Sequence, residues 1–267
     1  MHTQHFIKSI LSFFYSLYGF SLFVIIVIFL FPCLIVIMLL GKIRGGNIMY
    51  DLFRILAKLW LRLTGINHTI TYETTPDADT QYIFVCNHIS YLDAILVIPT
   101  LTHHFRPIGK YELLKIPIFG FLYKYCVITV NRSNAEDRAR SLNDLRKVLA
   151  TGISILVFPE GTFNESSEPL TTMYDGAFKL AIETGKTIQP VLLLDSFDRL
   201  HFSSLFKLTP GKSRAIYIEQ INPSDYPLAD AKELKAITEK IMSDKLIEYK
   251  APWINLKHNP QPIASSA

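Results

Sequence analysis

The stretch YIFVCNHISYLD, from Tyr82 to Asp93, decides the fold class because it joins a strand pattern to a helix pattern. Tyr82–Cys86 is a short apolar run of the kind that forms a buried strand. A helical pattern follows from Tyr91 to about Thr100, and polar residues separate the two. A buried strand that leads directly into a helix is typical of an α/β sheet.

The same alternation of short apolar runs and helical patterns continues to about residue 250. Strands are expected at 70–74, 82–86, 107–108, 127–130, 153–158, 188–194 and 215–218, and helices at 91–100, 111–125, 135–151, 177–184 and 231–250. The helix at 111–125 should be broken at Pro117 and Gly120. Strands bounded by helices predict a mixed, largely parallel sheet with helices on both faces.

Residues 1–65 come before this sheet and are expected to form a transmembrane or interfacial helical anchor. No charged residue occurs from Ser9 to Gly41, and the segment at about 20–40 is long enough to cross a bilayer core of roughly 30 Å. A cleaved signal peptide would have a shorter apolar core and a small-residue cleavage site. Pro32 either kinks one span or marks the bend of a re-entrant hairpin.

The residues after the apolar run are basic and amphipathic. Lys42 and Arg44 follow the run closely, whereas only Lys8 precedes it, so the positive-inside rule places the rest of the chain in the cytoplasm. Residues 46–64 have charged and apolar positions at helical spacing. They predict an amphipathic helix that either lies in the membrane interface or packs on the domain.

Composition and short motifs exclude several functions. The net charge of +4 comes without a basic patch that alternates with aromatic residues, so no nucleic-acid partner is expected. The three cysteines match no metal or disulfide pattern, which favours a reducing compartment. His103-His104 lacks the context of a metal hydrolase, and no Walker motif is present. Residues 152–156 lack the final glycine of a nucleophile elbow. No metal site is therefore expected.

Polar segments follow three of the expected strands. Asn87 to Asp93, Asn131-Arg132 and Pro159 to Thr162 each begin where an apolar run ends. Open α/β sheets bind ligands outside the carboxyl ends of their strands, so these segments should converge on one site.

His88 and Asp93 form a chemically sensible pair within this site. A neutral imidazole can take a proton from a hydroxyl near pH 7, and a carboxylate on its far nitrogen would fix the tautomer. The alternative is structural, because Ser90 to Asp93 also matches a helix capping box. A single histidine near an apolar strand is more often structural than catalytic.

Four ordered blocks carry a family resemblance. NHISYLD (Asn87–Asp93) resembles the N-H-x4-D motif of the glycerolipid acyltransferases, which include the 1-acyl-glycerol-3-phosphate acyltransferases. GKYELLKIPIFG (Gly109–Gly120) is similar to the second block, which ends at Arg132. FPEGT (Phe158–Thr162) is similar to the third block, and Ile188–Val191 to the fourth. Together they span about residues 80 to 195, a far more specific signal than any single motif.

The resemblance implies a role for each matching residue. His88 would be the general base, with Asp93 as its orienting partner. Arg132 would bind the phosphate of the acceptor. Glu160, Gly161 and Thr162 would hold the glycerol part of the acceptor, and backbone N–H groups of that turn would stabilise the oxyanion.

The implied reaction needs two substrates and no cofactor. A fatty acyl group would move from acyl-CoA or acyl carrier protein to a membrane lipid acceptor, 1-acyl-glycerol-3-phosphate, to give phosphatidic acid. The acyltransferase domain would occupy residues 66–252, with a flexible tail at 253–267. The enzyme would sit in the cytoplasmic (inner) membrane, with this domain on the cytoplasmic face.

One residue departs from the family pattern. The third block usually ends in arginine, but Phe163 stands there in this chain. Either Lys110 or Lys179 supplies the missing charge, or the acceptor is another lysolipid such as a lyso-aminolipid. A membrane scaffold that keeps the fold without activity is the non-enzymatic alternative. The donor and the acyl chain length stay open.

Overall fold

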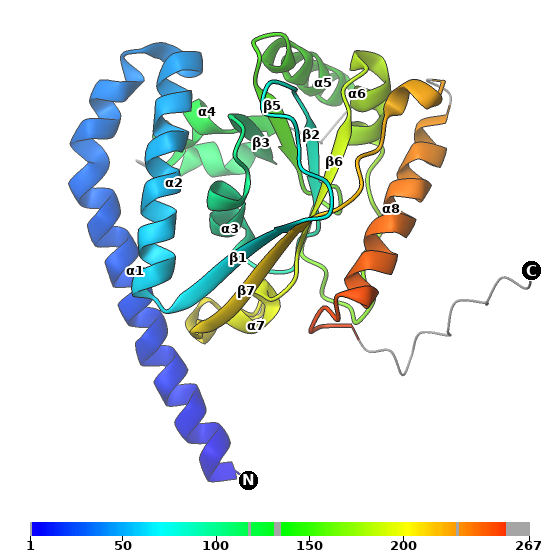
Figure 1. Ribbon diagram of the computed structural model, residues 1–267. Helices are drawn as coiled ribbons and strands as arrows, with labels where there is room; N and C mark the ends of the chain where they lie inside the picture. The colour runs from blue at the N-terminus through cyan, green and yellow to red at the C-terminus, as the bar shows by residue number, and fades with distance from the viewer. Residues whose placement is uncertain (1, 117–118, 131–134, 228–229, 255–267) are drawn as a thin grey trace, which may run out of the picture.

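A computed structural model of the chain describes residues 2–116, 119–130, 135–227 and 230–254 (Figure 1). Its centre is a seven-stranded sheet in the order β1-β7-β6-β2-β5-β3-β4. The strands are β1 Ile66–Tyr72, β2 Ile83–Cys86, β3 Phe105–Lys110, β4 Ile128–Val130, β5 Ser154–Val157, β6 Ile188–Leu193 and β7 Gly211–Tyr217. All neighbouring strands are parallel except β6 and β7, so the predicted mixed, largely parallel sheet is confirmed.

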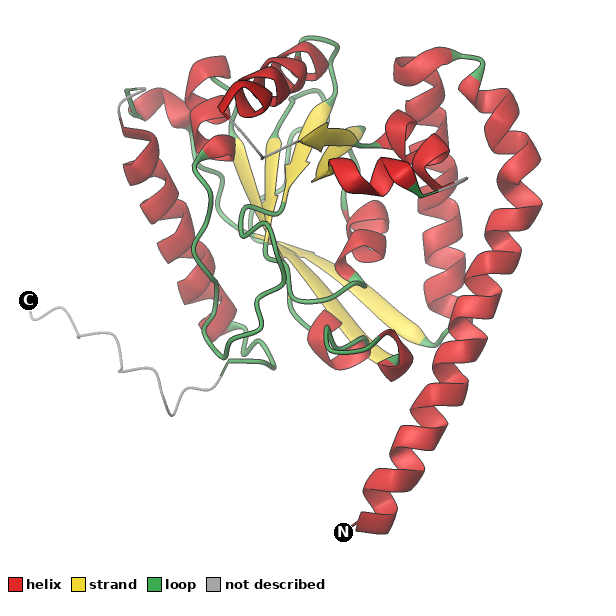
Figure 2. Cartoon of the chain, turned by 180° about the vertical axis from the view of Figure 1, so that it is seen from behind, coloured by secondary structure: helices red, strands yellow, loops and turns green. Residues whose placement is uncertain are grey.

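Helices cover both faces of the sheet, as Figures 1 and 2 show. The main helices are α1 His2–Met38, α2 Gly46–Leu63, α3 Asp93–Thr100, α4 Phe119–Cys126, α5 Ala135–Leu149, α6 Gly176–Thr184 and α8 Ala231–Glu248. Side chains of a strand alternate between the faces. Ile83 and Val85 therefore join the core under α5, α6 and α8, whereas Phe84 and Cys86 join the core under α1 to α4.

Most expected elements occur within a few residues of their predicted ends. The helix expected at 111–125 is two pieces, the 3-10 helix η2 (Tyr111–Lys115) and α4. Gly120 allows the close approach of these pieces, because a Cβ there would lie 2.1 Å from the Leu114 carbonyl oxygen. The short helices α7 (Ser196–Arg199), η3 (Leu205–Lys207) and η4 (Pro223–Asp225) were not expected, because they are too short to show an apolar period.

The first two helices form an antiparallel hairpin (Figure 1). α1 continues through Pro32, so the alternative in which this proline marks a hairpin bend is wrong. The chain reverses instead at residues 39–45, which include the π-helix η1 (Gly41–Gly45). Gly41 has a φ of 81°, a left-handed conformation that only glycine adopts without strain.

One side of α1 packs on the rest of the molecule. Ser16 accepts a hydrogen bond from the backbone N–H of Leu208 at 2.9 Å, and the Trp60 indole donates to the Gly19 carbonyl at 2.9 Å. The opposite side exposes large apolar side chains, for example Phe29 with 80% of its surface accessible. Ser9–Met38 is long and apolar enough to cross a membrane by length and composition, which indicates membrane association.

The helix expected at 46–64 is α2, and it has features of both alternatives. Met49 and Trp60 are buried against the domain and α1. Ile55, Leu59 and Leu63 lie on the other side and are exposed. The helix therefore packs on the domain and still presents an apolar stripe.

Candidate active site

The predicted polar segments meet at one edge of the sheet because the strands before them are parallel neighbours. β5 lies between β2 and β3, and all three run in the same direction. His88 follows β2, Glu160 follows β5, and Lys110 ends β3. β6 also runs parallel to β2 and ends at this edge.

Asn87 ties the histidine segment to β6. Its amide nitrogen donates to the Leu193 carbonyl at 3.0 Å, and its amide oxygen accepts from the Leu193 N–H at 2.8 Å. These two hydrogen bonds continue the pairing of β2 with β6 through the Asn87 side chain. They hold the backbone before His88 in place. Sequence reasoning gave Asn87 no role of its own, and its place in the N-H-x4-D block was the available signal.

His88 and Asp93 form the pair that the sequence predicted. The His88 Nδ1 lies 2.9 Å from the Asp93 Oδ2, and the same oxygen accepts from the N–H groups of Ile89 and Ser90 at 2.7 and 2.8 Å. Because this Asp93 oxygen already accepts two backbone N–H groups, it acts as an acceptor toward His88 as well. The proton between His88 and Asp93 therefore sits on Nδ1. No described residue bonds Nε2, and 19% of the His88 side chain is accessible. A protonated Nδ1 leaves Nε2 with a free lone pair.

The turn before α3 contains one of the two bonds of a capping box as well as the His88–Asp93 contact, and Leu92 is the N-cap of the helix. The Ser90 hydroxyl accepts from the Leu92 N–H at 3.0 Å, and the Asp93 carboxylate returns to the Ser90 N–H. These bonds hold the entry to α3 in a tight turn. The turn brings Asp93 back over His88, so a local structural motif also positions the imidazole.

Glu160 connects the histidine segment to the loop after β5. Its Oε1 accepts from the His88 N–H at 2.8 Å, and its Oε2 accepts from the N–H and hydroxyl of Thr171 at 2.8 and 2.9 Å. Burial raises the pKa of the Glu160 carboxyl, whereas the donors from Thr171 and His88 oppose this rise. Gly161 has a φ of 71° and closes the tight turn that aims Glu160 at His88.

Two aromatic rings surround the imidazole. The Phe158 ring stacks on His88 with centroids 4.2 Å apart, and the Phe163 ring meets it edge-on at 4.5 Å. Phe163 also contacts Tyr91. At the position where the family pattern has arginine, this chain therefore places an apolar ring against His88. The sequence revealed the substitution but not this contact.

The remaining predicted residues are less closely joined to the pair. Thr162 is exposed in the turn after Gly161, and Lys110 is exposed at the same edge of the sheet. Lys179 is exposed on α6, where it lowers the pKa of Asp175 together with Lys235 and Lys232. Arg132 lies outside the described residues.

The described part of the chain holds no group of three His, Cys, Asp or Glu side chains that could bind a metal ion. Its cysteines are free thiols. The chemistry that the arrangement itself supports is proton transfer at His88 Nε2, beside the rings of Phe158 and Phe163 at the edge of the sheet.

Known proteins resemble this chain in sequence. The model of the Acyltransferase family matches residues 67–194. A 1-acyl-sn-glycerol-3-phosphate acyltransferase of Cocos nucifera is 25% identical over 80% of this chain and 68% of its own length. The enzyme of that name from Borreliella burgdorferi is 32% identical over 55% of this chain and 59% of its own length. The chain thus spans from about half to two thirds of the relatives it matches.

A solved structure shares the fold. The 1-acyl-sn-glycerophosphate (LPA) acyltransferase PlsC of Thermotoga maritima superimposes with a TM-score of 0.74 and 22% identity, over 93% of this chain and all of that one. The matched family region includes His88, Asp93 and Glu160, the residues that the fold brings together. Residues 67–194 therefore form a domain of the Acyltransferase family, and the chain resembles glycerolipid acyltransferases in sequence and in fold.

Proposed function

We propose that this protein transfers a fatty acyl group from a thioester, acyl-CoA or acyl carrier protein, to the free hydroxyl of 1-acyl-glycerol-3-phosphate, which gives phosphatidic acid. The observation that carries the proposal is the His88–Asp93 pair, with Nδ1 bound to the carboxylate and Nε2 open. A scaffold without activity would not need a buried carboxylate that is aimed at a partly exposed imidazole.

In the proposed reaction, His88 Nε2 takes the proton of the acceptor hydroxyl while its oxygen attacks the thioester carbonyl carbon. The tetrahedral intermediate then collapses, the C–S bond breaks, and the thiolate leaves with the proton from Nε2. Asp93 stabilises the imidazolium between these steps. The rings of Phe158 and Phe163 keep water away from the base.

The oxyanion of the intermediate needs N–H donors that the fold leaves free. The Gly161 N–H already donates to the Phe158 carbonyl at 3.0 Å. The backbone N–H of Thr162 has no partner among the described residues, so we assign it to the oxyanion. Because both Glu160 oxygens are engaged, we assign Glu160 a positioning role. The acceptor contact expected of it stays a prediction.

The acceptor is tested with purified protein, both donor types, and a panel of lysophosphatidic acid and a lyso-aminolipid. Arg132→Ala should raise the KM for lysophosphatidic acid, and Arg132→Lys should restore it only in part, because lysine loses the fork geometry. Lys240→Ala serves as a control that removes an exposed cation from α8. Unchanged lysophosphatidic acid kinetics in Arg132→Ala would contradict this acceptor.

The lyso-aminolipid remains a second candidate because Phe163 replaces the arginine of the family pattern with an apolar ring beside His88. Phe163→Arg distinguishes the two. If lysophosphatidic acid is the acceptor, the variant should keep or improve its affinity. If the acceptor has no phosphate monoester, an unpaired charge beside His88 should lower turnover.

We further propose that the α1–α2 hairpin holds the enzyme in the cytoplasmic (inner) membrane, with residue 42 onward on the cytoplasmic side. The exposed apolar face of α1, followed by Lys42 and Arg44, supports this placement. Carbonate washing should not release the protein, and protease added outside intact cells should leave the catalytic domain uncut. A tag at residue 1 is cut from outside only if α1 crosses the bilayer. Cleavage of the domain from outside would reverse the assignment.

A further inference from the structure

A concave surface lies away from His88, between α2, β1 and the end of α3. It is an open cleft of about 530 Å³. Its walls are apolar at Leu61, Ile66, Ile70 and Pro99. None of these residues contributes to the site around His88, so the cleft has no part in the proposed chemistry.

Two cationic side chains line this cleft, and no residue that the structure describes forms an ion pair or hydrogen bond with either of them. Lys58 and Arg62 are one helical turn apart on α2, and both line the cleft. Both side chains are exposed, and neither forms an ion pair or hydrogen bond with any residue that the structure describes. No acidic residue lines the cleft. The site therefore combines an apolar floor with two uncompensated positive charges.

The third titratable residue of the cleft does not add to this charge. His68 on β1 bonds the Ser213 hydroxyl through Nδ1 at 3.0 Å and the Thr100 hydroxyl through Nε2 at 2.8 Å. Burial lowers the pKa of His68 to about 4, so its ring is neutral at physiological pH. The positive field of the cleft comes from α2 alone.

The position of the cations on α2 indicates what the cleft binds. Ile55, Leu59 and Leu63 form the exposed apolar stripe of this helix, and Lys58 and Arg62 lie next to it on the side of the cleft. A helix whose apolar stripe enters the acyl region holds the neighbouring cations at the level of the lipid head groups. An anionic phospholipid would meet the cations with its phosphate and the apolar floor with the start of its acyl chains.

We propose that this cleft binds one anionic phospholipid of the surrounding membrane, with Lys58 and Arg62 on its phosphate. The site is separate from the acceptor site at His88. The proposal requires the membrane attachment of the α1–α2 hairpin but not acyl transfer, so it can be tested when no turnover is measured.

The test uses the full chain in a neutral detergent and a phosphatidylglycerol probe with a fluorescent acyl chain. Lys58→Gln/Arg62→Gln should weaken binding of this probe by about thirty-fold. Each basic residue near an anionic lipid surface contributes roughly 1 kcal/mol to binding, and the variant loses two of them. A phosphatidylcholine probe should bind weakly to both proteins alike. Raising the salt from 0.1 to 0.5 M should reduce binding to the unchanged protein and have little effect on the variant.

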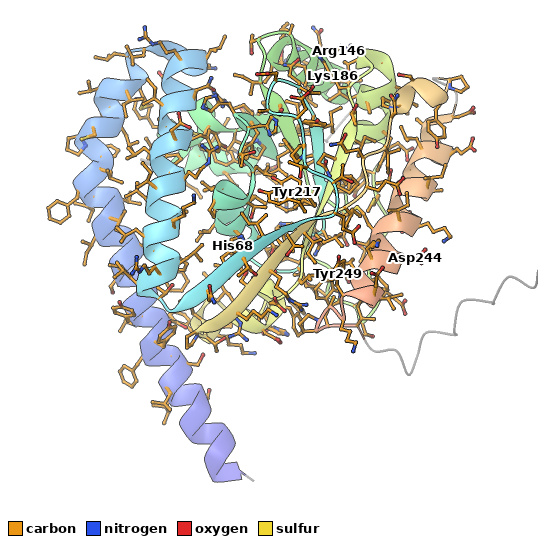
Figure 3. The ribbon with its side chains drawn as sticks, viewed as in Figure 1. His68, Arg146, Lys186, Tyr217, Asp244 and Tyr249 are labelled. Carbon is orange, nitrogen blue, oxygen red and sulfur yellow. The ribbon has the colours of Figure 1, made fainter. Side chains whose placement is uncertain are left out.

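The matched control is Lys186→Gln/Lys232→Gln, which removes the same charge elsewhere. Figure 3 places Lys186 at the top of the molecule, away from His68, and Lys232 belongs to α8, on the other face of the sheet in Figure 1. This control should bind phosphatidylglycerol like the unchanged protein. Thermal melting should be the same for all variants, because every altered side chain is at the surface.

Two results would overturn the proposal. Equal phosphatidylglycerol affinity in the Lys58/Arg62 variant and the unchanged protein would show that these cations bind no lipid. Free glycerol phosphate is the competitor in the second case. If it displaces the probe fully at a concentration near the Kd of the phosphatidylglycerol probe, the cleft is a site for soluble phosphates. A failure of acyl transfer with lipid binding intact would instead contradict the proposed enzymatic function and leave this site standing.

Discussion

Two histidines lie at opposite ends of α3, and their environments differ in one decisive respect. His88 bonds Asp93, the first residue of α3, through Nδ1, and no residue that the structure describes bonds its Nε2. His68, which Figure 3 labels, bonds Thr100, the last residue of α3, through Nε2 and Ser213 through Nδ1. A base needs a free lone pair and a neighbouring anion that stabilises its charged form. Only the Asp93 end of α3 provides both.

The comparison shows what turns a histidine into a candidate base in this fold. Both rings are partly buried and hydrogen-bonded, so burial and bonding alone do not distinguish them. Two hydroxyl partners can exchange donor and acceptor roles with a neutral ring, and they leave the ring structural. A buried carboxylate that already accepts two N–H groups fixes the proton on Nδ1, and Nε2 has no partner among the described residues.

The largest effect should come from removing the ring at the Asp93 end. His88→Ala should lower acyl transfer by about 10² to 10⁴-fold, the usual contribution of a general base. The protein should still fold and stay in membranes, as judged by circular dichroism and fractionation. His68→Gln is the matched control at the other end of α3. Near-normal turnover in a folded His88→Ala protein would remove the proposed mechanism.

The next effect concerns the partner of His88. Asp93→Asn keeps the size of the side chain and an oxygen for the two N–H groups, but it removes the anion. Turnover should fall by about 10²-fold or more, because the imidazolium loses its stabilising charge. Thr100→Val is the matching change at the other end of α3, because it removes the hydroxyl group that bonds His68 and keeps the size of the side chain. If both variants lose turnover to the same degree, the distinction between the two ends of α3 is wrong.

A smaller effect should come from Glu160, which positions His88 without replacing its partner. Glu160→Gln offers one amide nitrogen where the carboxylate accepted N–H groups, so one buried donor loses its acceptor. We expect a loss of about ten-fold, from roughly 1–3 kcal/mol for an unsatisfied buried donor. The loss should appear in kcat. An effect on the acceptor KM alone would instead support the acceptor contact that the sequence predicts, and Thr171→Val serves as the milder comparison.

The smallest effect on turnover should come from His68, where a change of less than about threefold is expected. Replacing His68 should instead change the pH dependence of the free energy of unfolding. The pKa of about 4 in the folded protein lies below the ordinary value of 6.5. His68 therefore contributes stability above pH 6.5, and this contribution is lost as the pH falls toward 4. His68→Gln should flatten the fall of melting temperature in this window, which corresponds to at most about 3 kcal/mol. An unchanged pH profile would show that His68 is not buried as described.

Local patterns predicted the elements well, because each apolar run or helical period reports its own burial. β2, β5 and β6 and the helices α5 and α8 occur close to the expected ends. Pairing partners were harder. The antiparallel contact of β6 with β7 and the place of β1 at the edge of the sheet depend on where a distant strand returns. No local period carries that information.

In the candidate site, too, local contacts could be predicted from the sequence and contacts between distant segments could not. The N-H-x4-D spacing predicted the His88–Asp93 contact, because five residues around a helix start allow only a few geometries. The ring of Phe163 against His88 and the bonds of Thr171 to Glu160 were not predictable, since they join loops that touch only after the sheet is assembled. The same holds for the place of Glu160, both of whose oxygens the fold engages.

The sequence by itself determined the class of chemistry, the alternating α/β pattern and the long apolar N-terminal helix, because these depend on residue types at short spacing. Only the tertiary structure decided which histidine has an open nitrogen and that α1 turns back at Gly41 rather than at Pro32. It alone placed Lys58 and Arg62 over an apolar cleft. Each of these depends on contacts between segments far apart in the chain, and such contacts form only when the helices pack on both faces of the finished sheet.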